Sequence, residues 1–355
     1  MFKSKSFITL IIIIFTAIII SGCSVSFKTK DGGGYNGGVY KTVNKGNTWR
    51  QKALIPTISG KPKNIGGLNV NSMAMDPSDN HAIYFGSHDN GLFYAYDGAD
   101  NWQVADKLGK ITIKAVAVDP GSKCIIYTAS VNKVHKSTDC NRTWSQVYYD
   151  NNVNVTVNTI AIDYYDSANL YIGTSRGEVI KSSDRGVSWQ TIQRLEDDVK
   201  KIVISPYDSR VVFAATAKKG IYRSTDSGKT WADLSEKLKE FKDSMKFRDL
   251  TATDAEAGVV VLATDYGLLR SFNNGETWTK IELITPEKKA TINAVAVSPN
   301  NSKEIYYVTN TTFYRSIDGG ENWTTKKLPT ARAGWKLLID PKDTNIIYLG
   351  VRSLK

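Results

Sequence analysis

Short apolar runs of β-type sequence, four to six residues long, recur along the chain with clusters of turn residues between them. The segment from Val199 to Leu234 contains four such runs, KKIVIS, VVFAAT, GIYRST and TWADL, separated by PYDS, AKKG and DSGK. Runs of this length between clusters of Pro, Gly, Asp and Ser are typical of antiparallel strands. The same order recurs elsewhere without a convincing long helix, so the pattern predicts an all-β protein built from four-stranded units.

An octapeptide of the form S-x-D-x-G-x-T-W lies between the third and fourth predicted strands of each unit. Its copies align on a tryptophan, and 42 to 53 residues separate successive tryptophans. One such unit cannot bury both faces of its sheet alone, whereas units stacked around an axis can, which predicts a β-propeller. The aligned tryptophans are Trp49, Trp102, Trp144, Trp189, Trp231, Trp278 and Trp323.

The two ends of the repeat region are complementary. After Trp323 the sequence WKLLIDPKDTNIIYLG supplies only the first two strands of a unit, and residues 37–51 supply only the last two. Joined, they complete a seventh blade and leave no edge strand exposed. We therefore expect residues 37–355 to form one seven-bladed β-propeller of four-stranded antiparallel blades, closed where N-terminal strands join C-terminal strands.

Each position of the octapeptide has a structural explanation. Its Asp accepts hydrogen bonds from backbone N–H groups of the turn, its Gly provides a positive φ, and its Trp is a large apolar anchor. Asn44 and Asn273 replace Asp but keep an acceptor oxygen, and the copy with Ala95 and Ala99 is expected to be the least regular. The turn aspartates are Asp97, Asp139, Asp184, Asp226 and Asp318.

These octapeptides resemble the Asp-box, or BNR, repeat. The full copies are similar to those of sortilin-type propellers, photosystem II assembly/stability factors, xyloglucan-active glycoside hydrolases and sialidases, and the resemblance covers residues 37–355. It implies a propeller in which the repeat is a structural turn far from the functional site. Seven near-equivalent copies agree with that, because they cannot mark one unique centre.

The first residues predict export. Lys3 and Lys5 precede an apolar run of 14 residues, which is shorter than a membrane-spanning helix requires. The ISGC ending resembles the bacterial lipobox, which implies a signal peptide over residues 1–22 and lipidation of Cys23. An uncleaved N-terminal anchor is the alternative. Residues 23–36 are expected to be a flexible tether that holds the protein to the outer membrane or to the outer face of the cytoplasmic membrane.

The charge balance is basic. The net charge is +11 for the whole chain, and removal of Lys3 and Lys5 with the signal leaves +9. Outside the cytoplasm such a balance favours anionic lipids, acidic glycans or an acidic protein partner over nucleic acid. A solvated basic surface with no specific partner is the alternative.

Two further cysteines, Cys124 and Cys140, lie in one unit, on its second strand and in its octapeptide. The predicted hairpin register places them nearly opposite each other. Because an envelope location permits disulfides, we expect a bridge, with two free thiols as the alternative.

Propeller ligands usually contact one end of the axis, on the face formed by the links between units and by the turns between second and third strands. Charged and aromatic residues fall in these segments, so the face is expected to be basic and to bind the partner. The candidate binding residues are Arg176, Lys218, Lys219, Lys288, Arg332, Tyr148, Tyr149, Asp89 and Asp265.

The sequence provides weaker evidence for an enzyme than for a binding protein. A sialidase requires three arginines and a Tyr–Glu pair, and only Arg176 and Arg332 are near the axis. The xyloglucan-active enzymes use paired carboxylates between two propellers, and one propeller is predicted here. No phosphate loop or metal-binding cluster is recognisable, so no cofactor or metal is expected. The sequence favours a non-catalytic envelope protein that binds an envelope or membrane protein, with a polysaccharide-binding or glycosidase propeller as the alternative.

Overall fold

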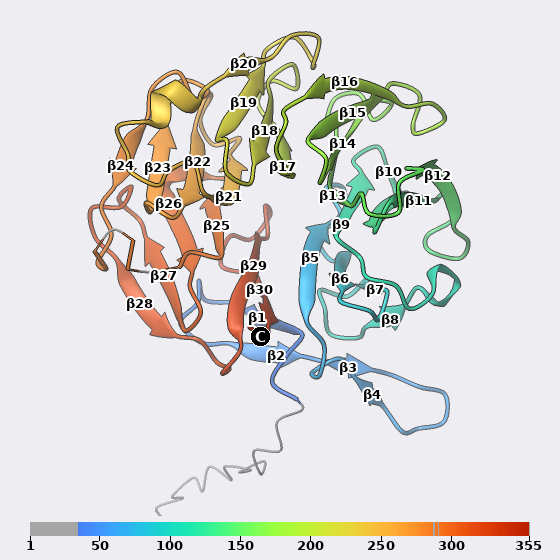
Figure 1. Cartoon of the computed structure of the whole chain (residues 1–355). Helices are drawn as coiled ribbons and strands as arrows, with labels where there is room; N and C mark the ends of the chain where they lie inside the picture. Colours follow the sequence, from blue (N-terminus) through green and yellow to red (C-terminus); the bar gives the residue numbers. More distant parts are fainter. Residues whose placement is uncertain (1–34, 287, 290, 355) are drawn as a thin grey trace, which may run out of the picture. The chain divides into compact units, whose positions relative to one another are not determined.

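The computed structural model describes residues 35–354 except 287 and 290. The predicted signal, Cys23 and residues 24–34 of the predicted tether lie outside the described residues. The chain forms seven four-stranded antiparallel sheets arranged about a common axis, which confirms the predicted seven-bladed β-propeller (Figure 1). No helix in the part of the chain that the structure describes is long and apolar enough to cross a membrane.

In the first three blades the strands follow one another in chain order from the axis outward. The first blade contains β5 (Val70–Met75), β6 (Ile83–Ser87), β7 (Leu92–Ala95) and β8 (Gln103–Val104). The second contains β9 (Ala115–Asp119), β10 (Ser122–Ser130), β11 (Lys133–Ser137) and β12 (Ser145–Tyr149). The third contains β13 (Val157–Ile162), β14 (Leu170–Thr174), β15 (Glu178–Ser182) and β16 (Gln190–Arg194).

The next three blades repeat this order. The fourth contains β17 (Val199–Ile204), β18 (Val212–Thr216), β19 (Ile221–Ser224) and β20 (Ala232–Asp233). The fifth contains β21 (Phe247–Ala252), β22 (Val260–Thr264), β23 (Leu268–Ser271) and β24 (Thr279–Ile281). The sixth contains β25 (Ala294–Ser298), β26 (Asn301–Val308), β27 (Thr312–Ser316) and β28 (Thr324–Lys327).

The seventh blade joins the two ends of the repeat region. It contains β29 (Ala333–Ile339), β30 (Ile347–Arg352), β1 (Val39–Thr42) and β2 (Arg50–Lys52). Strand β1 pairs with β30 in antiparallel register, with Tyr40 opposite Leu349. The remaining described elements are a hairpin of β3 (Leu54–Ile55) and β4 (Lys63–Asn64), and two 3-10 turns, η1 (Asp106–Leu108) and η2 (Ser235–Leu238). The predicted closure is therefore confirmed.

The apolar core lies between neighbouring blades. One cluster, for example, joins Tyr171 and Val179 of the third blade to Val199, Ile202 and Val212 of the fourth, and all five are buried. Because each sheet shares its faces with two neighbours, a blade cannot bury its apolar residues without them.

The octapeptide turns are closed by side-chain hydrogen bonds. In the fourth blade, the buried Ser224 hydroxyl donates to Asp226 over 2.8 Å and accepts the N–H of Gly228 over 2.7 Å. Both the N–H and the hydroxyl of Thr230 donate to the same carboxylate. The copy predicted to be least regular lacks the first of these groups, because Ala95 has no hydroxyl.

Three of the turns also accept hydrogen bonds from the preceding blade. The carbonyl of Ser227, the residue after Asp226, accepts hydrogen bonds from Tyr171 (2.9 Å) and Lys181 (3.0 Å) of the third blade. The corresponding carbonyl of Arg185 accepts from Tyr127 and Lys136 of the second blade. The same pair of hydrogen bonds links the two ends of the ring, since the carbonyl of Gly98 in the first blade accepts hydrogen bonds from Lys41 and Tyr348 of the seventh.

One turn is covalently attached to its own sheet. A disulfide joins Cys124 on β10 to Cys140 in the octapeptide turn of the second blade. The backbone N–H of Cys140 also donates to the carbonyl of Cys124 over 3.2 Å.

Removal of the Tyr171 hydroxyl should destabilise the propeller. We expect Tyr171→Phe to lower the free energy of unfolding by about 1 kcal/mol, because the Ser227 carbonyl loses a donor inside the interface between two blades. Tyr207→Phe, at an exposed tyrosine, is the matched control and should change little. Denaturant unfolding of both variants measures the difference, and equal stability would contradict a structural role of the hydrogen bond from Tyr171 to Ser227.

The octapeptide turns should make the protein sensitive to acid. Hydrogen bonds from the Thr230 hydroxyl, the Thr230 N–H and Ser224 lower the pKa of Asp226 to about 2 from 3.8, and the pKa values of Asp184 and Asp318 are also about 2. A carboxylate with a depressed pKa contributes stability above its unfolded value, and this is lost as pH falls from about 4 through about 2.

Replacing Asp184, Asp226 and Asp318 together by Asn keeps acceptor oxygens but removes the titration. Unfolding temperatures measured between pH 5 and pH 2 should therefore fall less steeply for the triple variant than for the natural chain. Asp254→Asn, outside the octapeptides, is the control. A triple variant with the unchanged acid slope would contradict this account.

Candidate axial binding site

A pocket of about 290 Å³ lies on the propeller axis. Its position follows from its lining, because residues of all seven blades contribute to it and only the axis is shared by all of them. Every contribution comes from the start of an innermost strand, from the residues just before it, or from the end of β30. The lining residues are Asn71, Lys114, Asn158, Lys200, Lys201, Phe247, Arg248, Asp249, Ile292, Asn293, Trp335, Lys336 and Arg352.

A β-bulge at the start of five innermost strands supplies much of this lining. In the third blade Val157 pairs with Thr174 and Thr159 pairs with Gly173, so Asn158 is an extra residue between them. Bulges of this kind redirect a side chain and recur next to binding sites. The same shift occurs on β5, β17, β21 and β29.

The other two blades show an equivalent arrangement. The N–H groups of Lys114 and Asn293 donate to the carbonyls of Ala129 and Val308, which are already paired with the next residue of each innermost strand. Seven equivalent positions therefore form a ring around the pocket, which we call the bulge ring. Its members are Asn71, Lys114, Asn158, Lys200, Arg248, Asn293 and Trp335.

Amide side chains make up three positions of the bulge ring. The side-chain nitrogen of Asn71 donates to the carbonyl of Ile113, that of Asn158 to Asp198 and Val199, and that of Asn293 to Asn310. These bonds fix the amides. No described residue donates to the side-chain oxygens of the three asparagines, so each can accept a hydrogen bond from a ligand.

An aromatic residue and a guanidinium form one wall. Arg352 lies over the indole ring of Trp335, with its guanidinium carbon 4.8 Å from the ring centroid. Such a pair offers a flat apolar surface beside a positive charge.

One carboxylate, that of Asp249, lies among the described residues of the pocket lining. It is buried, accepts a hydrogen bond from Lys201 over 2.6 Å, and accepts the N–H of Val295 over 3.0 Å. Burial alone raises the pKa of Asp249, but the charges of Lys201 and Lys336 together with these hydrogen bonds outweigh burial and lower it. Asp249 is therefore ionised at neutral pH.

The cations of the pocket outnumber this carboxylate. Desolvation lowers the pKa of Lys336, and the charges of Lys201 and Arg352 lower it further, although Asp249 opposes them. The pKa of Lys114 is lowered by desolvation and then by Arg352 and Lys200. Lys114, Lys200, Lys201, Lys336 and Arg352 all line this one pocket.

The residues predicted from the sequence lie outside this lining, mostly in local pairs. Arg176 contacts Asp150 and Glu178, while Arg332 donates to Asn36, Asn69 and nearby carbonyls. Of the predicted residues, Asp265 is linked to the pocket, because it accepts a hydrogen bond of 2.5 Å from Arg248 of the bulge ring.

The other predicted residues are spread over neighbouring loops. The N–H groups of Lys218 and Lys219 donate to Asp197, and Lys288 lies 3.4 Å from Asp243. Tyr148 packs edge-on against Trp189, the ammonium of Lys133 lies over Tyr149, and Asp89 contacts His88 and Thr112. These contacts do not bring the nine residues together in one pocket.

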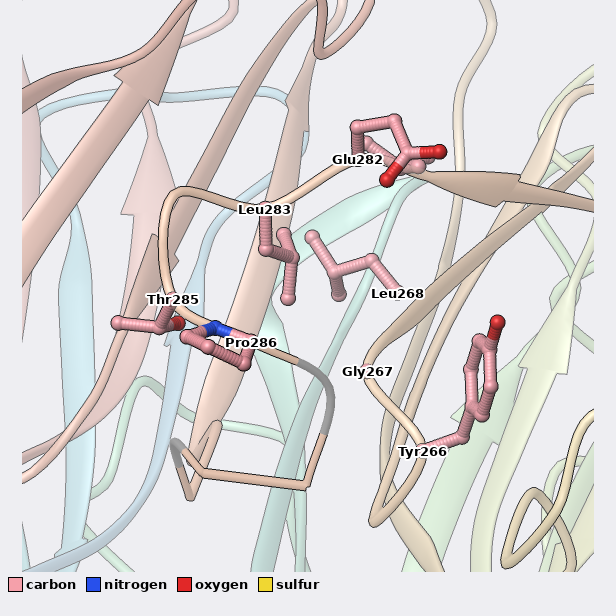
Figure 2. Close-up of a pocket in the computed structure, with 8 residues that line it drawn as sticks. Tyr266, Gly267, Leu268, Glu282, Leu283, Thr285 and Pro286 are labelled. Carbon is pink, nitrogen blue, oxygen red and sulfur yellow. The ribbon is translucent and has the colours of Figure 1, made fainter.

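A second pocket, of about 390 Å³, lies between the edge of the fifth blade and the link to the sixth (Figure 2). Leu268 and Leu283 point toward each other at its centre, with Thr285 and Pro286 on the link beside them. Its described lining mixes polar and apolar groups and includes one carboxylate, that of the exposed Glu282.

Comparison with known proteins confirms the predicted resemblance to sortilin-type and photosystem II assembly-factor propellers. The Sortilin-Vps10 family model (sortilin, neurotensin receptor 3) matches residues 177–261. Two structures of YCF48 share the fold: one bound to D1 peptide (TM-score 0.62, 16% identity) and one from Cyanidioschyzon merolae (TM-score 0.60, 12% identity). The matches cover 81% and 80% of this chain and 93% and 95% of those chains.

Glycoside hydrolases also match. A xyloglucanase from Hypocrea jecorina (strain QM6a) is 30% identical over 118 residues, which are 27% of this chain and 14% of that protein. The GH74 xyloglucanase of Xanthomonas campestris shares the fold with a TM-score of 0.64 and 18% identity, over 86% of this chain and 52% of that chain. The chain thus spans about half of that enzyme.

These matches contradict the expectation of a non-catalytic protein. That expectation depended on the single predicted propeller and on the missing sialidase residues, whereas part of the chain is 30% identical to a xyloglucanase.

Removal of the pocket carboxylate should destabilise the fold at neutral pH. We expect Asp249→Asn to cost about 2 kcal/mol, because Lys201 loses its counter-charge in a partly buried site. Asp208→Asn removes the half-buried partner of the exposed Arg210 and is the matched control, with an expected cost below about 1 kcal/mol.

Denaturant unfolding at pH 7 compares the two variants. Since the pKa of Asp249 is lowered on folding, the difference should be present above the unfolded pKa of about 3.9 and should diminish as pH falls below it. Equal costs for both variants at pH 7 would contradict a structural role of the Asp249–Lys201 pair.

Proposed function

We propose that this protein is a carbohydrate-active propeller that binds a polysaccharide at the axial pocket, with hydrolysis of a glycosidic bond as its candidate reaction. The bulge ring carries this proposal. Its three amide oxygens can accept hydrogen bonds from sugar hydroxyls, and the indole of Trp335 offers an apolar surface for a sugar ring. The matches to xyloglucanases support the class of ligand.

Hydrolysis requires two carboxyl groups, one on each side of the bond that is cleaved. Asp249 is the candidate for the ionised role, nucleophile or base, because its pKa is lowered. Asp198 is the candidate for the second carboxyl group. It contacts both Asn158 and Lys200 of the bulge ring, and its side chain is 27% exposed at the edge of the pocket.

A second candidate function is recognition of an acidic protein segment. The cations of the pocket favour it, and one of the similar structures is YCF48 bound to D1 peptide. If Cys23 is lipidated as the sequence predicts, either ligand would be met in the bacterial cell envelope, with an envelope or membrane protein as the partner in the second case.

Binding and cleavage can be tested on the purified full chain. We expect an increase in reducing ends when the chain is incubated with its polysaccharide, with xyloglucan as the first substrate of a panel of neutral and acidic polysaccharides. Asp249→Asn and Asp198→Asn should each abolish cleavage, and Asp198→Asn does so without removing a buried charge. Trp335→Ala should weaken binding about tenfold, equivalent to about 1.4 kcal/mol.

Tyr207→Ala is the control for Trp335→Ala, because Tyr207 is an exposed aromatic residue beyond the far end of β17 from Lys200. Binding without cleavage would remove the hydrolase part of the proposal. No binding to any polysaccharide in the panel would overturn the proposal as a whole.

A further inference from the structure

The charges around the bulge ring point to one class of polysaccharide. Among the described residues of the lining, six side chains are cationic and one, that of Asp249, is a carboxylate. They come from the second, fourth, fifth and seventh blades, so cations occupy several sides of the pocket. The cations are Lys114, Lys200, Lys201, Arg248, Lys336 and Arg352.

Three of these cations have ion-pair partners among the described residues. Lys201 contacts Asp249, Lys200 contacts Asp198, and Arg248 contacts Asp265. These pairs neutralise half of the positive charge within the protein.

The other three cations have no carboxylate within ion-pair distance in the part of the chain that the structure describes. They are Lys114, Lys336 and Arg352. Like charges that are held close together destabilise one another, and an anion bound between them relieves that repulsion. The pocket is therefore arranged for a ligand that brings negative charge.

The neighbours of these cations restrict the class of anion. The amide oxygens of Asn71, Asn158 and Asn293 accept hydrogen bonds, which an anionic group cannot donate but a hydroxyl can. Arg352 lies over Trp335, so a cation and an apolar face occupy one wall. A ligand that satisfies all of them carries hydroxyls, an apolar ring face and a negative charge together.

We infer that the axial pocket selects polysaccharides whose sugars carry anionic groups, carboxylate or sulfate. This inference rests on the proposed function and specifies its substrate class. The anionic group lies against Lys114, Lys336 and Arg352, while the amides of the bulge ring accept hydrogen bonds from the sugar hydroxyls. Neutral glucans leave the three cations without a counter-charge and bind more weakly.

Binding of the full chain to four soluble polymers tests the inference by calorimetry at low salt. The probes are polygalacturonate (carboxylates on sugars), dextran sulfate (sulfates on sugars), dextran (neutral sugars) and polyglutamate (carboxylates on a peptide). We expect polygalacturonate or dextran sulfate, or both, to bind at least tenfold more tightly than dextran and polyglutamate. The two acidic polysaccharides distinguish carboxylate from sulfate.

Variants then locate the effect. Lys114→Met and Lys336→Met keep the length of the side chain, and each should weaken binding of the acidic polysaccharide about tenfold. Lys326→Met, on the exposed outermost strand β28, makes the same change in net charge and is the matched control. Circular dichroism confirms that each variant is folded.

The remaining outcomes separate the inference from the proposed function. Dextran binding as tight as that of the acidic polysaccharides overturns the inference and leaves the proposed function standing. Polyglutamate as the tightest ligand overturns the inference in favour of an acidic protein segment. Equal losses for Lys326→Met and Lys336→Met show general charge attraction and also overturn it. If none of the three polysaccharides binds, the inference fails, and the proposed function fails with it only if xyloglucan and the other polysaccharides of the panel do not bind either.

Discussion

The contact between each octapeptide turn and the preceding blade is the interaction on which the rest of the structure depends. A carbonyl of the turn, such as that of Ser227, accepts hydrogen bonds from a tyrosine and a lysine of the neighbouring sheet. Because the apolar clusters also lie between blades, no sheet is complete without its neighbour. The ring must therefore close, and the pairing of β1 with β30 closes it.

This construction separates stability from ligand binding. The octapeptides follow the third strands, at the ends opposite to the bulges, so their hydrogen bonds do not constrain the bulge ring. The bulges repeat because the blades repeat, but the extra residue of each bulge is not needed to pair the strands. Its side chain can differ from blade to blade, and it does so as Asn, Lys, Arg or Trp. A symmetric scaffold thus carries an asymmetric pocket.

The sequence predicted the fold, whereas it did not identify the axial pocket, for physical reasons. Strand order, blade number and ring closure follow from repeated local patterns. The bulge ring depends on an extra residue that shifts the alternation of side chains between the two faces of a strand. This extra residue cannot be recognised from the sequence of a single repeat. Arg176 and Arg332 were predicted as ligand-binding residues, but their charges and donors meet local partners, Glu178 and Asn36 among them. Aligning the first strands would have placed Asn71, Asn158 and Lys200 at one equivalent position.

The balance of charges at the axis explains why Asp249 lies where it does. In a pocket lined by six cations alone, the repulsion between them would lower the stability of the fold. One buried carboxylate between Lys201 and Lys336 reduces that repulsion. A second buried carboxylate would neutralise more charge but would leave less for a ligand. In the observed arrangement Lys114, Lys336 and Arg352 have no direct ion-pair partner among the described residues. The propeller is therefore less stable than it would be with all charges of the axial pocket neutralised.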